Sequence, residues 1–167
     1  MLYTAQLRNV GPISIRYPRG NCRNQNWQCD FEEIPIGKAR CVVKGEKVAR
    51  LSIGTVGYIV DDAMDILHKE NITPSHYDMR FVKPLDEELL TNIFWEYSQI
   101  ITIEDNALQG GFGSAILEFA ADKGFSIPVK RFGIPDKFIE HGKQSQLHKV
   151  CGYDAQSLCE YVRDRMS

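Results

Sequence analysis

The sequence predicts an α/β fold: a three-layer sandwich built on a mainly parallel five-stranded sheet with one antiparallel edge strand. Strand-like and helix-like runs alternate over most of the chain, which favours right-handed crossovers between parallel strands. The run "QIITIED" (99–105) is apolar almost throughout, as in strands that are buried on both faces. A hairpin-like segment ahead of the first long helix supplies the antiparallel strand.

The N-terminal segment does not resemble the start of a domain. "YTAQLRNV" has the pattern of a helix end, and "GPISIRYPRG" contains a predicted strand from Ile13 to Tyr17 that Pro18 ends. A helix end and a lone strand cannot bury themselves. We therefore expect residues 1–20 to end a domain whose body lies elsewhere, and the polar stretch 21–36 to be a linker.

The next elements are two strands and a helix. In "KARCVVKGEKVARLSIG" two strand-like runs flank Lys44-Gly45-Glu46, which predicts an antiparallel hairpin. Apolar residues then recur at helical spacing and place a helix over about 57–70. "SHYDMRF" is expected to be a strand.

The second half of the chain repeats this alternation. Asp86 is a predicted helix cap, followed by acids in the first turn. The strand "QIITIED", a helix over 114–123 and the strand "PVKRFGIP" follow. The last helix is expected to begin at the cap Asp154. Four parallel strands and the antiparallel edge strand make up the sheet.

Composition excludes several classes of function. The 167 residues are 43% hydrophobic, enough for one good-sized core, and the formal charge of −2 indicates neither a nucleic-acid surface nor a polybasic membrane patch. No apolar run approaches the roughly 18 residues of a membrane span, and "MLYTAQLRNV" lacks signal-peptide architecture. The five cysteines have no CxxC spacing, which favours reduced thiols in a cytoplasmic protein.

Ligands of such sheets gather at the carboxyl ends of the strands. The residues expected there are Thr55, Asp78, Arg80, Glu104, Asp105 and Asp136. Glu104 and Asp105 could form an acid/base pair with separated pKa values. However, neighbouring residues of a strand point to opposite faces, so a role in loop capping and helix-dipole stabilisation is favoured.

The glycine loop Gly110-Gly111-Phe112-Gly113-Ser114 resembles a phosphate cradle only superficially. GxGxxG and Walker spacings are both absent, and six residues separate Ile103 from Gly110. The glycines are expected to allow positive φ and close helix-to-sheet approach. Anion binding at a helix start near Ser114 stays open on dipole grounds.

The histidines and the "RYPRG" turn are two further candidate sites. The four histidines form no HxxxH or His-Cys cluster, so a metal site is not expected. His141 could serve a neighbouring site, but a satisfied loop histidine is favoured. In "RYPRG", Pro18 ends the strand, and Arg19 is placed to grip a phosphate or to form an interdomain salt bridge. Arg16 is expected to be structural.

Several segments together resemble one family. "GPISIRYPRG", "GEKVARLSIGT", "DMRFVKPLDEELL", "EDNALQGGFGSAILEF" and "GIPDKFIEHG" occur in this order. They are similar to the C-terminal part of the 1-deoxy-D-xylulose-5-phosphate synthase family, thiamine-diphosphate enzymes of the transketolase superfamily. The resemblance spans essentially all 167 residues. "RYPRG" and "GIPDKFIEHG" distinguish this family from the rest of the superfamily.

The resemblance implies a division of the chain. Residues 1–20 would end the pyrimidine-binding domain, 21–36 would be the linker, and 37–167 would form a transketolase C-terminal domain. The family's Gly-Asp-Gly…Asn motif for diphosphate and metal is absent from this sequence. Thiamine diphosphate and Mg²⁺ are therefore expected in the full-length enzyme and not on this chain, and the glycine loop is expected to be a packing and interface turn.

The resemblance also implies a function. The family joins pyruvate to glyceraldehyde 3-phosphate with loss of CO₂, and Arg19 would reach the phosphate of the aldehyde. This chain would buttress a homodimer, contact the missing N-terminal domains and be inactive alone. Two alternatives remain: a docking or regulatory module of a split 2-oxo acid dehydrogenase-like or transketolase-like enzyme, and an independent nucleotide-binding domain, which the spacing of the glycine loop disfavours.

Overall fold

The computed structural model describes residues 1–7, 11–18, 23 and 28–166 of the chain. In chain order its elements are α1 (Leu2–Ala5), β1 (Arg40–Val43), β2 (Val48–Ile53), the 3₁₀ turn η1 (Gly54–Val56), α2 (Gly57–His68), β3 (Ser75–Asp78), α3 (Glu87–Glu96), β4 (Gln99–Ala107), α4 (Phe112–Asp122), β5 (Val129–Ile134), α5 (Gln144–Val150) and α6 (Ala155–Met166).

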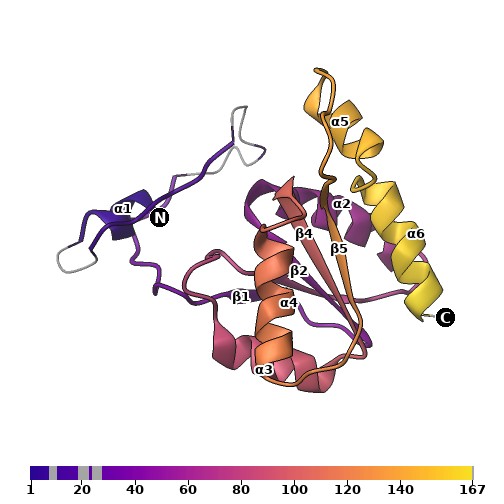
Figure 1. Ribbon diagram of the computed structural model, residues 1–167, viewed down its shortest axis with the longest axis horizontal. Coiled ribbons are helices and arrows are strands. Elements are labelled where there is room, and N and C mark those ends of the chain that lie inside the picture. The colour runs from indigo at the N-terminus through magenta and orange to yellow at the C-terminus, as the bar shows by residue number, and fades with distance from the viewer. Residues whose placement is uncertain (8–10, 19–22, 24–27, 167) are drawn as a thin grey trace.

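One sheet organises the domain, with the strand order β1-β3-β2-β4-β5. Strands β3, β2, β4 and β5 run parallel, and β1 lies antiparallel to β3 at the edge. Helices α3 and α4 cover one face of the sheet, and α2 and α6 cover the other (Figure 1). The predicted fold class, with four parallel strands and one antiparallel edge strand, is confirmed.

The two faces of the sheet bury separate cores because side chains alternate along each strand. On β4, Ile101 and Ile103 pack with α2 and α6, whereas Ile100 packs with α3 and α4. The first six residues of β4 are all buried, which confirms that this strand is covered on both faces. The same alternation decides which layer each polar side chain at the carboxyl end of β4 reaches.

The predicted hairpin between β1 and β2 is wrong. Arg40 lies opposite Asp78, so β1 pairs with β3, and β3 separates it from β2. The turn between β1 and β2 packs on the start of β3: Gly45 N donates to Ser75 Oγ (2.6 Å) and Glu46 N donates to Thr73 O (3.0 Å). These contacts direct β1 to the free edge of β3.

Both predicted caps are confirmed. Asp86 accepts a hydrogen bond from Leu89 N (3.3 Å) at the start of α3, and Asp154 accepts one from Ser157 N (3.0 Å) at the start of α6. Asp86 also accepts from Ala39 N (3.1 Å), so the same carboxylate joins α3 to the segment entering β1. The helix α5 was not predicted, and none of its residues is buried.

The described residues of 1–36 are called the N-terminal arm. It extends to one side of the sandwich (Figure 1). The predicted strand from Ile13 to Tyr17 is wrong: this segment is not a strand, and among the described residues it pairs with none of β1 to β5. The arm is held together locally, because buried Thr4 accepts a hydrogen bond from Ile34 N (2.9 Å) and Tyr3 stacks on Phe31.

Candidate functional site

The carboxyl ends of the parallel strands meet at one edge of the sheet, and the N-terminal arm lies beside that edge. A cleft of about 1800 Å³ separates them. The cleft is lined by Thr55, Asp78, Arg80, Glu104 and Asp105, five of the six residues that the sequence placed at this edge. Asp136 does not line it. The structure therefore brings most of the predicted site residues to one place.

Glu104 serves the helix that follows its strand. Its two carboxylate oxygens accept hydrogen bonds from Phe112 N (2.7 Å) and Gly113 N (2.8 Å) in the first turn of α4. The side chain is only 1% exposed. Burial raises the pKa of Glu104 above its usual value, and the two backbone donors oppose that rise. The predicted helix-dipole role is what the geometry shows.

The glycine loop is built around this carboxylate. Gly110 has φ +71°, and a Cβ at Gly113 would lie 2.6 Å from Thr102 Oγ1. The predicted roles of positive φ and close helix-to-sheet approach are confirmed. Helix α4 begins at Phe112, and its first backbone donors already hold Glu104. The hypothesis of an anion at this helix start therefore loses its basis, because the protein's own acid fills the position.

Ser114 belongs to the same internal network. Its hydroxyl donates to Leu108 O (2.9 Å) and lies 3.0 Å from a guanidinium nitrogen of Arg131. Arg131 also donates to Leu108 O (2.6 Å), so an arginine of β5 closes the loop from the other side. The loop is thus tied together by side chains of its own domain.

Asp105 points to the opposite face of the sheet, as the alternation predicted. Its carboxylate accepts a hydrogen bond from Tyr153 Oη (2.9 Å), just before α6. Its backbone oxygen accepts one from Arg16 Nη2 (2.7 Å), which comes from the N-terminal arm. Burial, followed by the bond to Asp105, raises the pKa of the Tyr153 hydroxyl. Glu104 and Asp105 thus serve different layers and do not form an acid/base pair.

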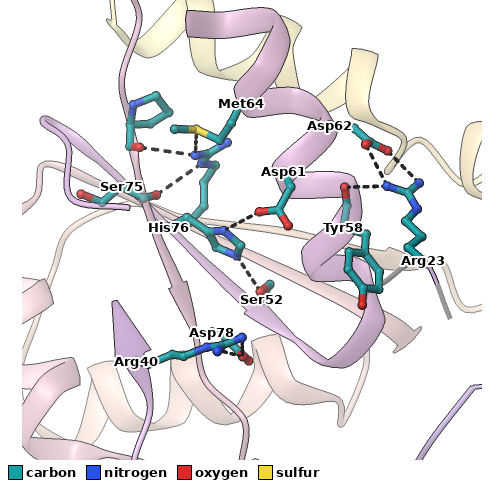
Figure 2. A network of polar contacts seen from close by, with 12 residues as sticks. Arg23, Arg40, Ser52, Tyr58, Asp61, Asp62, Met64, Ser75, His76 and Asp78 are labelled. Carbon is teal, nitrogen blue, oxygen red and sulfur yellow. Dashed lines mark hydrogen bonds and ion pairs between the residues drawn. The ribbon is translucent and has the colours of Figure 1, made fainter. Parts of the chain in front are cut away.

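A chain of polar contacts that sequence reasoning missed joins β2, β3 and α2 (Figure 2). Ser52 Oγ lies 2.8 Å from His76 Nε2, and His76 Nδ1 lies 3.3 Å from Asp61 Oδ1 without forming a hydrogen bond to it. Ser52 and His76 are both buried. Ser52 is paired with Asp78 in the ladder, so it is the diagonal neighbour of His76.

This Ser-His-Asp chain has the residue types of a nucleophilic site but not its properties. Ser52 has no exposed surface, and its hydroxyl lies near the start of α2, since a Cβ added at Gly57 would be 3.4 Å from Ser52 Oγ. Burial, with repulsion from Arg50 and Arg40, lowers the pKa of His76 to about 3. A general base needs a pKa near the working pH, so His76 is poorly suited to that role. We interpret the chain as a structural tie.

Arg50 is an unusually buried cation beneath the same helix. Its guanidinium donates to Ser75 O (3.3 Å) and Pro74 O (3.3 Å) and contacts the sulfur of Met64, while Nη1 has no hydrogen-bond partner among the described residues. Burial lowers the pKa of Arg50 to about 10. With Arg50 paired to His76 across the ladder, this cation helps to keep the imidazole neutral.

The remaining polar groups of the edge are more exposed. Arg40 Nε donates to Asp78 Oδ2 (3.1 Å), which ties the edge strand to β3. The other oxygen of Asp78 accepts from Arg80 N (3.2 Å), and Arg80 itself has φ +57°. Next to α2, Arg23 forms a bidentate ion pair with Asp62 of that helix (2.8 and 2.9 Å).

Apolar side chains also gather at the cleft. Seven large hydrophobic residues that are at least 38% exposed line it: Leu2, Tyr3, Tyr17, Phe31, Ile36, Val42 and Val82. Tyr17 and Phe31 are the most exposed of them, at 81% and 83%. Exposed apolar groups concentrated on one surface mark a place where another protein surface packs.

Two predicted residues lie away from this description. Arg19 falls outside the described residues. His141 lies in the loop between β5 and α5, where it lines a separate pocket of about 360 Å³ together with Phe138 and Leu147. The structure does not bring His141 to the cleft. Within the described ranges, no helix is long and apolar enough to cross a membrane, and no group of three or more His, Cys, Asp or Glu residues could hold a metal ion.

Comparisons with known proteins give a consistent result. The family model "Transketolase, C-terminal domain" matches residues 37–158. The 1-deoxy-D-xylulose-5-phosphate synthase of Cytophaga hutchinsonii is 54% identical over 165 residues, which cover 98% of this chain and 26% of that protein. The corresponding synthase of Bacteroides thetaiotaomicron is 47% identical over 98% of this chain and 27% of its own length. The chain thus spans about a quarter of the length of these relatives.

Solved structures support the fold. A structure described as "Split gene transketolase, inactive beta4 tetramer" is 26% identical, has a TM-score of 0.71, and matches 81% of this chain and 43% of its own. The transketolase of Campylobacter jejuni matches 77% of this chain and 18% of its own, at a TM-score of 0.54 and 16% identity, and so supports the fold alone.

Proposed function

Because the chain belongs to the transketolase C-terminal domain family, we propose that it is the C-terminal quarter of a 1-deoxy-D-xylulose-5-phosphate synthase. That enzyme is a transferase that joins pyruvate to glyceraldehyde 3-phosphate with loss of CO₂, at the start of isoprenoid and thiamine biosynthesis. The observation that carries the proposal is 54% identity over 98% of the chain, the N-terminal arm included. The expected compartment is the cytoplasm, as the cysteine pattern suggests.

We assign the parts of the chain accordingly. Residues 1–20 would be the end of the pyrimidine-binding domain, 21–36 the linker, and 37–167 the transketolase C-terminal domain. The family match begins at residue 37, and the first strand of the sheet begins at Arg40, both of which support this division. The arm contributes no strand to the sheet, as expected of a segment that belongs to another body.

The role of this part would be to buttress the enzyme and its homodimer. The cleft offers seven exposed apolar side chains to the preceding domains of the same enzyme. The similar split-gene transketolase chain is described as an inactive tetramer, which supports association without activity for a chain of this kind.

Thiamine diphosphate and Mg²⁺ would be held by those other domains. The described residues of this chain do not fit the cofactor: the helix N-terminus at the cleft is filled by Glu104, and no group of three or more His, Cys, Asp or Glu residues in the described ranges could hold a metal ion. We assign no catalytic residue to the chain. Its one proposed substrate contact is Arg19, which would grip the phosphate of the aldehyde.

The first test is deoxyxylulose 5-phosphate formation from pyruvate and glyceraldehyde 3-phosphate, with thiamine diphosphate and Mg²⁺. It would compare this chain alone, the N-terminal three quarters of the Cytophaga hutchinsonii relative alone, the two mixed, and a chimera in which this chain replaces the matching part of that relative. We expect the mixture or the chimera to form deoxyxylulose 5-phosphate and each piece alone to be inactive. Activity of this chain alone would contradict the proposal.

The Arg19 contact has its own test in the chimera. Arg19→Ala should raise the KM of glyceraldehyde 3-phosphate by about 30-fold or more, since losing a charged hydrogen bond costs about 2 kcal/mol or more. The KM of pyruvate should stay unchanged. An unchanged aldehyde KM would refute the assignment.

A docking module of a split transketolase-like enzyme is the second candidate, favoured by the likeness to the split-gene chain. It predicts an inactive chimera in the assay above, together with stable binding of this chain to a separately made N-terminal transketolase half. An active chimera decides for the synthase.

A further inference from the structure

Asp105 is the meeting point of two segments that are distant in sequence. Arg16, 89 residues earlier, donates to its backbone oxygen (2.7 Å), and Tyr153, 48 residues later, donates to its carboxylate (2.9 Å). One residue at the carboxyl end of β4 thus connects the N-terminal arm to the start of α6. We call Arg16, Asp105 and Tyr153 the latch.

The α6 end of the latch is firmly held. Tyr153 is 2% exposed, and its ring contacts the ring of His148 from α5, with centroids 4.8 Å apart. The next residue, Asp154, caps α6 through Ser157 N. A phenol fixed between two helices holds the carboxylate of Asp105 in one orientation, and with it the peptide whose oxygen receives Arg16.

The charge of Arg16 also affects two titratable groups at this edge of the sheet. The Arg16 guanidinium lowers the pKa of Glu104, although burial dominates and raises it overall. It likewise opposes the rise in the pKa of Tyr153 that burial causes. The negative charge of Glu104 therefore favours a cation at this position, in addition to the hydrogen bond from Arg16 to Asp105 O.

The latch has a defined relation to the proposed phosphate contact. Arg16 precedes Arg19 by three positions, and Pro18 between them has a fixed φ. Three residues of extended chain span at most about 11 Å. The hydrogen bond from Arg16 to Asp105 O therefore limits how far Arg19 can lie from the end of β4. Arg16 itself would not contact the substrate.

We propose that Asp105 and Tyr153, acting through Arg16, are positioning residues that set the affinity of the enzyme for the phosphate of its aldehyde substrate. The inference rests on the proposed synthase function and on the Arg19 contact. The transketolase C-terminal domain would then contribute to substrate recognition by holding the arm at the cleft, without contributing a group to the chemistry.

The test uses the active chimera with the substitutions Tyr153→Phe, Arg16→Gln and Arg19→Ala. Tyr153→Phe removes one hydroxyl and keeps the ring that packs on His148. It should raise the KM of glyceraldehyde 3-phosphate about five-fold, the scale of one hydrogen bond, with the KM of pyruvate unchanged. Arg16→Gln, which opens the latch from its other end, should have a similar effect. Tyr161→Phe, a tyrosine of α6 whose ring packs against Phe132, is the matched control and should change neither KM.

Two further measurements separate positioning from a general structural role. With D-glyceraldehyde, which lacks the phosphate, Tyr153→Phe should have no effect on kcat/KM. In the Arg19→Ala background, Tyr153→Phe should add nothing, because the contact that it positions is already gone.

Each outcome bears on the inference. A Tyr153→Phe enzyme with an unchanged aldehyde KM, with both KM values raised equally, or with the same loss in the Arg19→Ala background would overturn the latch alone. An Arg19→Ala enzyme with an unchanged aldehyde KM would overturn the phosphate contact, and the latch with it. If Tyr153→Phe fails to fold, Arg16→Gln on the exposed arm gives the same readout.

Discussion

The carboxylate of Glu104 lies 2.8 Å from the backbone nitrogen of Gly113, so the acid at the end of β4 occupies the helix N-terminus that the glycine loop creates. The glycine loop has a sequence pattern that suggests a ligand-binding site, but the position for the ligand is occupied by the Glu104 side chain. The chemistry of the pattern is unchanged, because a helix N-terminus still binds an anion. The anion is a side chain of the protein.

Glu104→Ala should destabilise the domain strongly. The change leaves the Phe112 and Gly113 backbone donors buried without a partner, which costs about 2 kcal/mol or more of unfolding free energy. Glu104→Gln keeps the shape and one acceptor oxygen, so its loss should be smaller. Urea unfolding followed by circular dichroism measures both, with the exposed Glu118→Ala of the same helix as the control. Equal stability of Glu104→Ala and the unchanged chain would contradict the role assigned to Glu104.

Gly113 is expected to tolerate no side chain. A Cβ at this position would lie 2.6 Å from Thr102 Oγ1 and 2.8 Å from Arg131 Cδ. Gly113→Ala should therefore lower the unfolding free energy by about 1–3 kcal/mol through overpacking. The matched control is Gly57→Ala at the start of α2, where the new Cβ would lie at an ordinary 3.4 Å from Ser52 Oγ. Thermal unfolding of the pair should show a clear loss for Gly113 and little change for Gly57.

His76 should make the domain sensitive to acid. Its pKa falls from 6.5 to about 3 in the folded chain, mainly because burial disfavours the imidazolium. The unfolded chain therefore binds a proton that the folded chain excludes between these two values. The unfolding free energy should decrease as the pH falls through this window, by up to about 1.4 kcal/mol per pH unit.

The pH effect is tested by urea unfolding at pH 7, 6 and 5. His76→Gln should flatten the pH dependence relative to the unchanged chain, whereas His68→Gln, at an exposed position of α2, should leave it in place. A slope that survives in His76→Gln would assign the acid sensitivity to other groups.

The cleft should make the isolated chain self-associate. No described part of the chain covers its exposed apolar side chains, and such surfaces associate in water. Light scattering at tens of micromolar should give a dimer or larger species, and Tyr17→Ser with Phe31→Ser should shift it toward monomer. Trp95→Ser, equally exposed but outside the cleft, is the control. A monomeric unchanged chain would count against the interface role.

The sequence predicted the layers of this fold well because they depend on local patterns. The helix cap at Asp86 needs only a short polar side chain before an amphipathic run, and the strand 99–105 needs only continuous apolar character. The separation of Glu104 from Asp105 followed from strand alternation alone, and the structure confirms it. These features are decided by residues within a few positions of one another.

What the sequence missed depends on pairing between distant segments. The hairpin was wrong because β1 and β2 are adjacent in sequence but not in the sheet. The Ser52–His76 contact arises only once β2 and β3 are in register. Helix α5 has no buried residue, so it has no apolar periodicity to reveal it. The Ile13–Tyr17 segment has the composition of a strand but pairs with no strand in the described part of the chain.

The order of strands in the sheet has a consequence for synthesis on the ribosome. Strand β1 emerges first, yet its partner β3 is made only after β2 and α2. Until Asp78 has left the ribosome, Cys41, Val42 and Val43 have no edge to join. Arg40 and Lys44 flank this short run, and such flanking charges disfavour pairing with another nascent chain. Within this domain, the edge strand is thus made before the central strands of the sheet and can pair only after them.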